Sequence, residues 1–273
     1  MLLTVMLAVA SGAVITRPVA NMYSGPSEGR DVVSQAIYGA NVGVLEDQGN
    51  WVHIRTPDEY TGWVPGSALL RNTTYAQNGT IAQVDNLYAH LYRDPDVTRR
   101  APLLTVPFET RLEVVAQPEK PSSWLQVRLP DDRSAWIQRG DVTLDPKPLN
   151  VTETMELARR FLGLPYTWGG TSSFGYDCSG YMQMLCRRRG YSLPRDAQPQ
   201  ADWTGVAPVA KDQIQAGDLL YFGSSDRKIT HTGMYIGNGE FINATTWNKP
   251  VIQIDKLDDP HWNSLLVACR RLR

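Results

Sequence analysis

Three cysteines and four histidines are the residues of this 273-residue chain best suited to nucleophilic chemistry. Cys178 stands in the string YDCSG, after a glycine-containing loop and at the first residue of a predicted helix. The unpaired N–H groups and the dipole at a helix N-terminus stabilise a thiolate, which is the nucleophilic form of cysteine. Cys186 falls on the apolar face of that helix and Cys269 in the strand-like LLVACRRL, so buried structural roles are expected for both. Cys178 is therefore the candidate nucleophile.

A general base for this thiol must come from elsewhere in the chain. His53 and His90 belong to short strands of the first half, and His261 lies in the polar stretch DDPHWN. His231, in contrast, begins the apolar strand HTGMYIG. A histidine on a strand that faces a cysteine at a helix start is the papain-type arrangement, in which the imidazole takes the thiol proton and later protonates the leaving amine. His231 is the predicted base.

A third polar group should orient the imidazole ring. Asn243, in FINAT, follows His231 by twelve residues, across the Asn238-Gly239 dipeptide that is typical of a tight hairpin turn. Its side-chain amide could accept the ring N–H and hold the tautomer. Because an asparagine carries no charge, the predicted role of Asn243 is orientation only.

The elements around these residues predict an α+β domain. Thr152 is the predicted N-cap of a helix that runs to about Leu162, and a second helix runs from Cys178 to about Arg189, where Gly190 ends it. The proline-containing string LDPKPLN precedes the first helix and is suited to a linker. We expect a helix-borne cysteine packed on an antiparallel sheet, whose predicted strands are DLLYF, HTGMYIG and EFINAT.

The first half of the chain contains an internal repeat, in which residues 21–69 match residues 90–142. The matching strings are NMYSGPS with HLYRDPD, GANVGVLED with ETRLEVVAQ, WVHIR with WLQVR, and YTGWVPGSAL with RSAWIQRGDV. Each copy is a run of short strands broken by turn residues, which predicts a small all-β barrel. The pattern resembles the bacterial Src-homology-3-like module over most of residues 13–143. This resemblance implies targeting or substrate selection rather than chemistry.

The second half resembles the NlpC family of papain-like cell-wall peptidases over about residues 150–273. Five strings carry the resemblance in the family's order: PYTWGG, YDCSG, LPRDAQPQ, GDLLYF and HTGMYIGNGEFINA. The predicted organisation is therefore a first barrel over 1–78, a second over 79–146 and a peptidase domain over 147–273. The third catalytic position, most often histidine in this family, is Asn243 here.

The resemblance implies further site residues. Tyr166, in PYTWGG, resembles the tyrosine whose hydroxyl stabilises the tetrahedral oxyanion together with the backbone N–H of Cys178. Asp177 and Ser179 border the nucleophile, where relatives hold the substrate amine and backbone. As alternatives, Tyr166 packs in the core, and Asp177 and Ser179 are a helix cap and a small first-turn residue.

Two barrels ahead of such a peptidase resemble the subgroup that cleaves γ-D-glutamyl–diamino acid bonds of murein peptides bearing a free N-terminal L-alanine. In that subgroup an acidic residue and a tyrosine of the first barrel reach the substrate amine, and the matching positions here are Glu28 and Tyr60. The alternatives are a solvated turn residue and a barrel-packing aromatic. A serine that some relatives place in the LPRD segment is Ala197 here.

The composition of the chain excludes some classes of binding partner. A net charge of -1 lacks the basic excess that nucleic-acid binding requires, and 42% hydrophobic residues indicate a globular protein. Three cysteines are too few and odd in number for a disulfide framework, so at least one thiol should be free. The histidines and cysteines lack metal-ligand spacing, so we expect no metal or cofactor. The expected partner is a murein peptide, with no nucleic acid and no membrane span.

The first ten residues, MLLTVMLAVA, are compatible with two cellular compartments. They are apolar and end like a secretory signal, yet they lack its positively charged start, so a first strand is the alternative. A signal remnant would imply export, and its absence a cytoplasmic role in wall recycling. The functional alternatives are an amidase or acyltransferase on the same cysteine and histidine, or a non-catalytic wall-binding protein.

Overall fold

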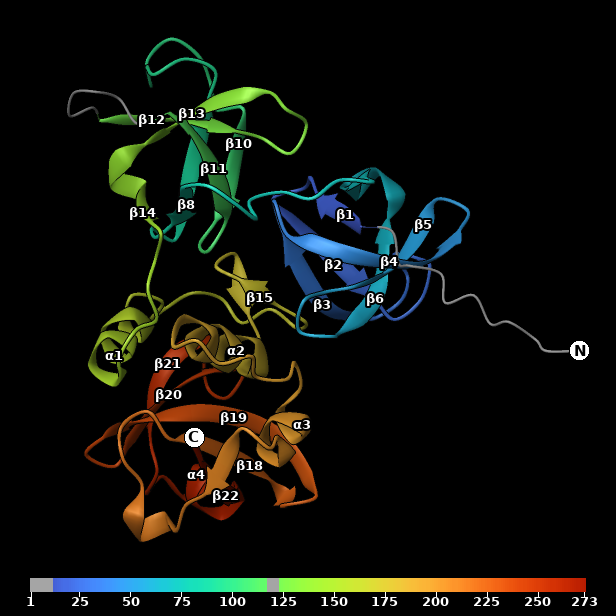
Figure 1. Ribbon diagram of the computed structural model, residues 1–273. Helices are drawn as coiled ribbons and strands as arrows, with labels where there is room; N and C mark the ends of the chain where they lie inside the picture. Colours follow the sequence, from blue (N-terminus) through green and yellow to red (C-terminus); the bar gives the residue numbers. More distant parts are fainter. Residues whose placement is uncertain (1–11, 117–122) are drawn as a thin grey trace, which may run out of the picture. The chain divides into compact units, whose positions relative to one another are not determined.

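The computed structural model describes residues 12–116 and 123–273 (Figure 1). These residues form two compact units. The first holds the described residues up to 31 together with 36–84 and 89–144, and the second holds 32–35, 85–88 and 145–273. Two short segments of the first half of the chain therefore belong to the unit that contains Cys178. The possible signal remnant lies outside the described residues, and the boundaries after residues 78 and 146 stay predictions.

Each copy of the sequence repeat forms a seven-stranded antiparallel sheet. The strands of the first are β1 (Gly12–Ile15), β2 (Val19–Tyr23), β3 (Val32–Ile37), β4 (Asn41–Gln48), β5 (Trp51–Arg55), β6 (Thr61–Pro65) and β7 (Leu69–Arg71). Those of the second are β8 (Ile81–Val84), β9 (Tyr88–Tyr92), β10 (Leu104–Pro107), β11 (Arg111–Ala116), β12 (Trp124–Arg128), β13 (Ser134–Gln138) and β14 (Val142–Leu144). The spatial orders are β3-β2-β6-β5-β4-β1-β7 and β10-β9-β13-β12-β11-β8-β14. The second order is the first with every number raised by seven, so the repeat predicted from sequence is a repeat of topology.

Buried and more exposed residues alternate along these strands, and the buried ones form the cores of the two sheets. In β5 and β12, every second residue is buried, as expected where one face of a sheet packs inward. Tyr38, which follows β3, is buried in the apolar cluster of the second sheet. Tyr75 is also buried, and its hydroxyl donates a hydrogen bond to the carbonyl oxygen of Arg128. Such contacts explain why both sheets fall in one compact unit.

The second unit is an α+β domain. Its helices are α1 (Val151–Arg159), α2 (Cys178–Arg188), α3 (Ala197–Asp202) and α4 (Pro260–Leu265). Its strands are β15 (Thr171–Ser172), β16 (Gly175–Tyr176), β17 (Val206–Pro208), β18 (Leu219–Ser225), β19 (Lys228–Gly237), β20 (Glu240–Thr245), β21 (Val251–Lys256) and β22 (Leu266–Leu272). The six-stranded sheet has the order β17-β22-β18-β19-β20-β21. Helix α2 packs against β19 and β20, as the sequence predicted.

The start of α1 corrects one prediction. Its N-cap is Asn150 rather than Thr152, and the helix ends at Arg159, short of Leu162. The Asn150 side chain accepts the Glu153 backbone N–H at 3.0 Å, and the Glu153 carboxylate accepts the Asn150 backbone N–H at 2.8 Å. This reciprocal capping box places the cap three residues before the glutamate, a spacing that Asn150 satisfies and Thr152 does not.

The hairpin that joins β19 to β20 is the predicted one. Asn238 and Gly239 have φ values of 55° and 74°, as the primed turns of two-residue hairpins require. Helix α4 was not predicted from the sequence, although its start signals are present: Asp259 caps the helix and Pro260 occupies its first turn. Within the described residues, no helix is long and apolar enough to cross a membrane.

Candidate active site

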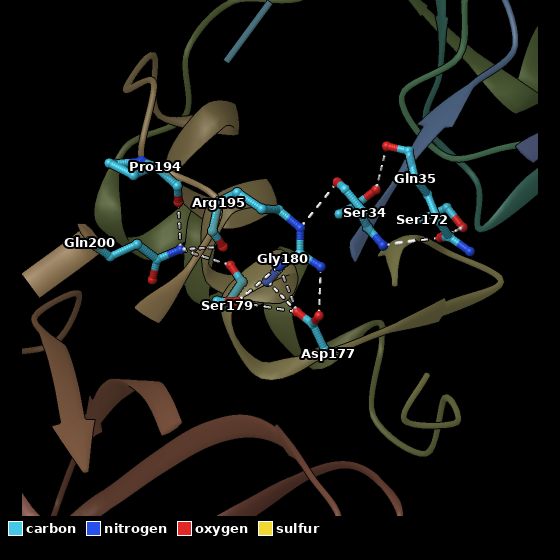
Figure 2. Close-up of polar contacts among 10 residues, drawn as sticks. Ser34, Gln35, Ser172, Asp177, Ser179, Gly180, Pro194, Arg195 and Gln200 are labelled. Atoms are coloured by element: carbon cyan, nitrogen blue, oxygen red, sulfur yellow. Dashed lines mark hydrogen bonds and ion pairs between the residues drawn. The ribbon is translucent and has the colours of Figure 1, made fainter. Parts of the chain in front are cut away.

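Cys178 is the first residue of α2, and Asp177 is its N-cap. The Asp177 carboxylate accepts the backbone N–H of Gly180 at 2.7 Å, which fixes the first turn of the helix (Figure 2). A Cβ atom at Gly180 would lie 2.2 Å from the carbonyl oxygen of Gly170, in the PYTWGG segment. The glycine therefore lets that segment pass directly over the start of the helix.

The thiol of Cys178 is buried, and burial dominates its ionisation. Burial raises the pKa of Cys178 to about 12, while hydrogen bonds from the backbone of Ser179 and Thr232 act to lower it. The sequence predicted that the helix start would favour the thiolate, whereas in the free site burial outweighs that effect. The resting group is the thiol. Because Thr232 follows His231 in β19, its hydrogen bond also places the sulfur beside the strand that carries the histidine.

His231 and Asn243 form the expected pair. The Nε2 atom of His231 lies 2.9 Å from the Oδ1 atom of Asn243, which is fully buried. Burial is the main cause that lowers the pKa of His231 to about 4, and the hydrogen bond to Asn243 acts in the opposite direction. The free site therefore holds a neutral imidazole, and its Nδ1 atom is not the one that contacts Asn243.

Gly233 provides the space for Asn243 on the neighbouring strand. A Cβ atom at Gly233 would lie 2.7 Å from the ring of Phe241 and 3.1 Å from the Cβ atom of Asn243. A side chain there would displace the amide that contacts His231. The first glycine of HTGMYIG, Gly233, is thus explained by close approach of the two strands.

Aromatic rings surround the imidazole. His231 stacks on Trp262 of α4 at a centroid distance of 5.0 Å and also contacts Phe222 of β18. His261, which the sequence placed outside the site, contacts Trp262 from the next position and stacks on Trp247 at 3.6 Å. The apolar stacking covers one face of the His231 ring.

Tyr166 lies near Cys178. Its side chain is half-buried, and its pKa is raised, mainly by burial and then by the charges that Cys178 and Asp177 would carry. At neutral pH its hydroxyl is therefore a hydrogen-bond donor, as stabilisation of an oxyanion requires. Its role as an oxyanion donor stays a prediction.

Asp177 and Ser179 contact a residue for which the sequence predicted no role. Arg195 pairs with Asp177, at 2.5 Å from Oδ2 and 3.0 Å from Oδ1, and donates to the Ser179 hydroxyl at 2.9 Å (Figure 2). The side chains of Arg195 and Asp177 are 1% and 10% exposed. The carboxylate predicted to hold the substrate amine is thus part of a buried ion pair. Gln200 donates to the carbonyl oxygens of Ser179 and Pro194 and so ties this segment to α2.

The segment 32–35 completes this network within the same compact unit. Arg195 donates from Nε to the hydroxyl of Ser34 at 3.2 Å (Figure 2). The neighbouring Gln35 accepts the Thr171 backbone N–H at 3.1 Å and the Ser172 hydroxyl at 3.2 Å. Residues of the first repeat therefore help to hold the arginine that orients Asp177.

The two predicted amine-binding residues of the first repeat lie in the first unit. Glu28 is exposed in the turn after β2, where it lines a hollow of about 400 Å³ together with Trp51 and Arg71. Tyr60 is half-buried before β6 and does not line that hollow. Their role in amine binding stays a prediction. In the described residues, no group of three or more histidine, cysteine and acidic side chains could hold a metal ion.

A cysteine at a helix start, with a histidine on the adjacent strand held by an asparagine, defines a papain-like cysteine peptidase. The NlpC/P60 family matches residues 163–271, the bacterial dipeptidyl-peptidase Sh3 domain matches 22–69, and the YKFC SH3b2 domain matches 84–144. The chain belongs to the NlpC/P60 family of cell-wall peptidases.

Two curated relatives and one crystal structure resemble most of the chain. The gamma-D-glutamyl-L-lysine dipeptidyl-peptidase of Bacillus cereus is 33% identical over 87% of this chain and 74% of its own length. The enzyme of that name from Bacillus subtilis is 30% identical over 88% and 81%. The crystal structure of an NlpC/P60 family protein from Bacillus cereus has a TM-score of 0.84 at 26% identity and covers 96% of this chain and 99% of that one.

Proposed function

We propose that this protein hydrolyses the amide bond between the γ-carboxyl of D-glutamate and the following diaminopimelate or lysine in murein peptides with a free N-terminal L-alanine. The contact between His231 and Asn243 at 2.9 Å, beside the sulfur of Cys178, carries the proposal for the chemistry. The relatives named for γ-D-glutamyl-L-lysine peptidase activity support the choice of bond.

In this mechanism, the Cys178 sulfur attacks the γ-carbonyl carbon while Nδ1 of His231 takes the thiol proton. The hydrogen bond from Nε2 to Asn243 holds the ring during the transfer. The imidazolium then protonates the nitrogen of the diamino acid, and the carbon–nitrogen bond breaks to leave a thioester. A water molecule, deprotonated by His231, attacks the thioester and releases L-Ala-D-Glu and the free thiol.

The negative charge that develops on the carbonyl oxygen needs donors. We assign these to the hydroxyl of Tyr166 and to the backbone N–H of Cys178, at the N-terminus of α2. Because the pKa of Tyr166 is raised, its proton stays in place throughout the neutral range. Removing one such donor from an enzyme lowers kcat by roughly 10²- to 10³-fold.

Recognition of the free amine is the second part of the proposal. Asp177 and Ser179 would hold the α-ammonium group and backbone of the substrate, with Arg195 orienting both side chains. Glu28 and Tyr60 would add contacts from the first repeat. A site that recognises a positive amine discriminates against peptides whose N-terminus is still acylated, because the acylated nitrogen carries no charge for the carboxylates to pair with.

Four peptides test both parts. L-Ala-γ-D-Glu-diaminopimelate and L-Ala-γ-D-Glu-L-Lys are incubated with the enzyme, each with a free and with an acetylated N-terminus, and products are identified by mass spectrometry. We expect L-Ala-D-Glu from the free-amine peptides and at least about 100-fold slower cleavage of the acetylated ones, since each 1.4 kcal/mol of lost binding is tenfold. Equal rates would overturn amine recognition. Cleavage at another bond, or of none of the four, would overturn the proposed function.

The neutral state of the catalytic pair predicts how Cys178 reacts with iodoacetamide. The thiolate is the reactive form, and with a pKa of about 12 only roughly 10⁻⁵ of the thiol is ionised at pH 7. Alkylation should therefore be slow at pH 7 and rise about tenfold with each pH unit up to pH 10. The labelled peptide that contains Cys178 reports the rate. A fast rate that is constant between pH 5 and pH 8 would show a thiolate paired with an imidazolium instead.

A further inference from the structure

Asp255 of β21 contacts the side chain that holds the catalytic histidine. The Nδ2 atom of Asn243 donates to Oδ2 of Asp255 at 2.9 Å and lies 3.4 Å from the carbonyl oxygen of Gln253. The side-chain amide of Gln253 in turn donates to both Asp255 oxygens, at 2.9 and 3.0 Å. The Asp255 carboxylate is therefore held by the Gln253 amide and accepts a hydrogen bond from Asn243.

The strand register explains this arrangement. Asn243 lies opposite Gln253 in the antiparallel pair of β20 and β21, so Asp255, two residues further along, is its diagonal neighbour on the same face. The hairpin between β19 and β20 brings His231 to Asn243 from the opposite side. Three adjacent strands thus supply one continuous chain of side chains.

These contacts determine which way the Asn243 amide points. A carbonyl and a carboxylate oxygen can only accept hydrogen bonds, so the NH₂ group of Asn243 must face Gln253 and Asp255. Its oxygen then faces His231, and Nε2 of the ring must be the protonated nitrogen. Without Asp255, the amide could turn and present its NH₂ group to the ring, which would move the proton to the wrong nitrogen.

Asp255 also supplies the charge that an asparagine lacks. Among the charged groups that act on His231, Asp255 and, more weakly, Asp177 favour its protonated form, whereas His261 of α4 disfavours it. On the side of α2, the sulfur of Cys178 has a hydrogen bond to the backbone of Thr232, the residue after His231. A negative group behind Asn243 stabilises the imidazolium that forms when the thiol proton is transferred.

We propose that Asp255 is a positioning residue of the catalytic site, which sets the orientation of Asn243 and through it the tautomer and basicity of His231. The functional chain is then Cys178, His231, Asn243 and Asp255, with Gln253 as support. The proposal rests on the catalytic roles proposed above for His231 and Asn243, and not on the identity of the substrate.

The first test compares Asp255→Asn with Asp258→Asn, which removes the same charge from an exposed position three residues away. We expect Asp255→Asn to lower kcat by about 10- to 100-fold with KM changed less than about twofold, as for residues that support a catalytic group. The control should keep the wild-type kcat. Wild-type kcat in Asp255→Asn would overturn the proposal.

A second measurement needs no substrate and separates positioning from mere stabilisation of the fold. In the Cys178→Ala background, the His231 ring is titrated by nuclear magnetic resonance with and without Asp255→Asn. Since Asp255 favours protonation of His231, its loss should lower the pKa of that ring further. An unchanged His231 titration would overturn the proposal even if the proposed function holds.

The Asn243→Ala variant tests whether Asp255 acts through Asn243. If Asp255 acts through Asn243, adding Asp255→Asn to Asn243→Ala should lower kcat by no more than about twofold beyond the single variant. Losses that multiply in the double variant would show an independent role for Asp255 and contradict the proposed chain.

Discussion

Replacing Cys178 by alanine is expected to lower kcat by roughly 10⁴-fold or more, to the limit of detection, because the acyl-enzyme has no atom on which to form. The reaction is followed with L-Ala-γ-D-Glu-L-Lys by release of L-Ala-D-Glu. Substrate binding should persist, since the Asp177 and Ser179 side chains are held by Arg195 and not by the sulfur. Isothermal titration with the same peptide should therefore give a Kd within a few-fold of the wild-type KM.

Cys186→Ala provides the matched control. Cys186 is fully buried on the same helix, so its removal tests the cost of losing a thiol from α2 without touching the reacting atoms. We expect wild-type kcat and a loss of about 1 kcal/mol in the free energy of unfolding. Residual activity of Cys178→Ala above one-tenth of wild type would remove Cys178 from the catalytic role.

Local signals in the sequence account for the parts of the site that could be predicted. The start of α2 at Cys178 follows from the break at Gly175 and the capping Asp177, and the β19–β20 turn follows from Asn238-Gly239. Both are properties of four to six neighbouring residues. Once the turn is known, the period of two along a strand is enough to bring Asn243 to the histidine side of the sheet.

The residues that sequence reasoning missed act over longer distances. Arg195 lies in LPRD, a string that carried the family resemblance, but its partners are 16 and 18 residues upstream and, in Ser34, 161 residues upstream. No periodicity connects such positions. The position of Asp255 could have been predicted from the sequence. Adding one more strand to the predicted hairpin pairs Asn243 with Gln253 and places Asp255 diagonally beside Asn243. His261 required α4, whose Asp-Pro start was present in the sequence.

The ion pair of Arg195 with Asp177 carries the second large expected effect. Replacing Arg195 by methionine preserves most of the side-chain length but leaves a carboxylate that is 10% exposed without its cation. Removing one partner of a buried pair typically lowers the free energy of unfolding by about 3–5 kcal/mol, because the remaining charge is shielded from water and has no opposite charge beside it. We expect a decrease of that size in the free energy of unfolding, measured by urea denaturation at neutral pH.

Arg160→Met is the appropriate comparison within the same compact unit. Arg160 pairs with Asp85 in the segment 85–88, but the two side chains are 40% and 39% exposed. Exposed pairs contribute about 0–1 kcal/mol, so this variant should lose less than 1 kcal/mol. Adding Asp177→Asn to Arg195→Met should restore part of the stability, since no unpaired charge then stays buried. Equal small losses in both arginine variants would mean that water reaches Asp177 freely. A carboxylate solvated to that degree could bind a substrate amine only weakly, so the result would also count against its proposed role in selecting free N-termini.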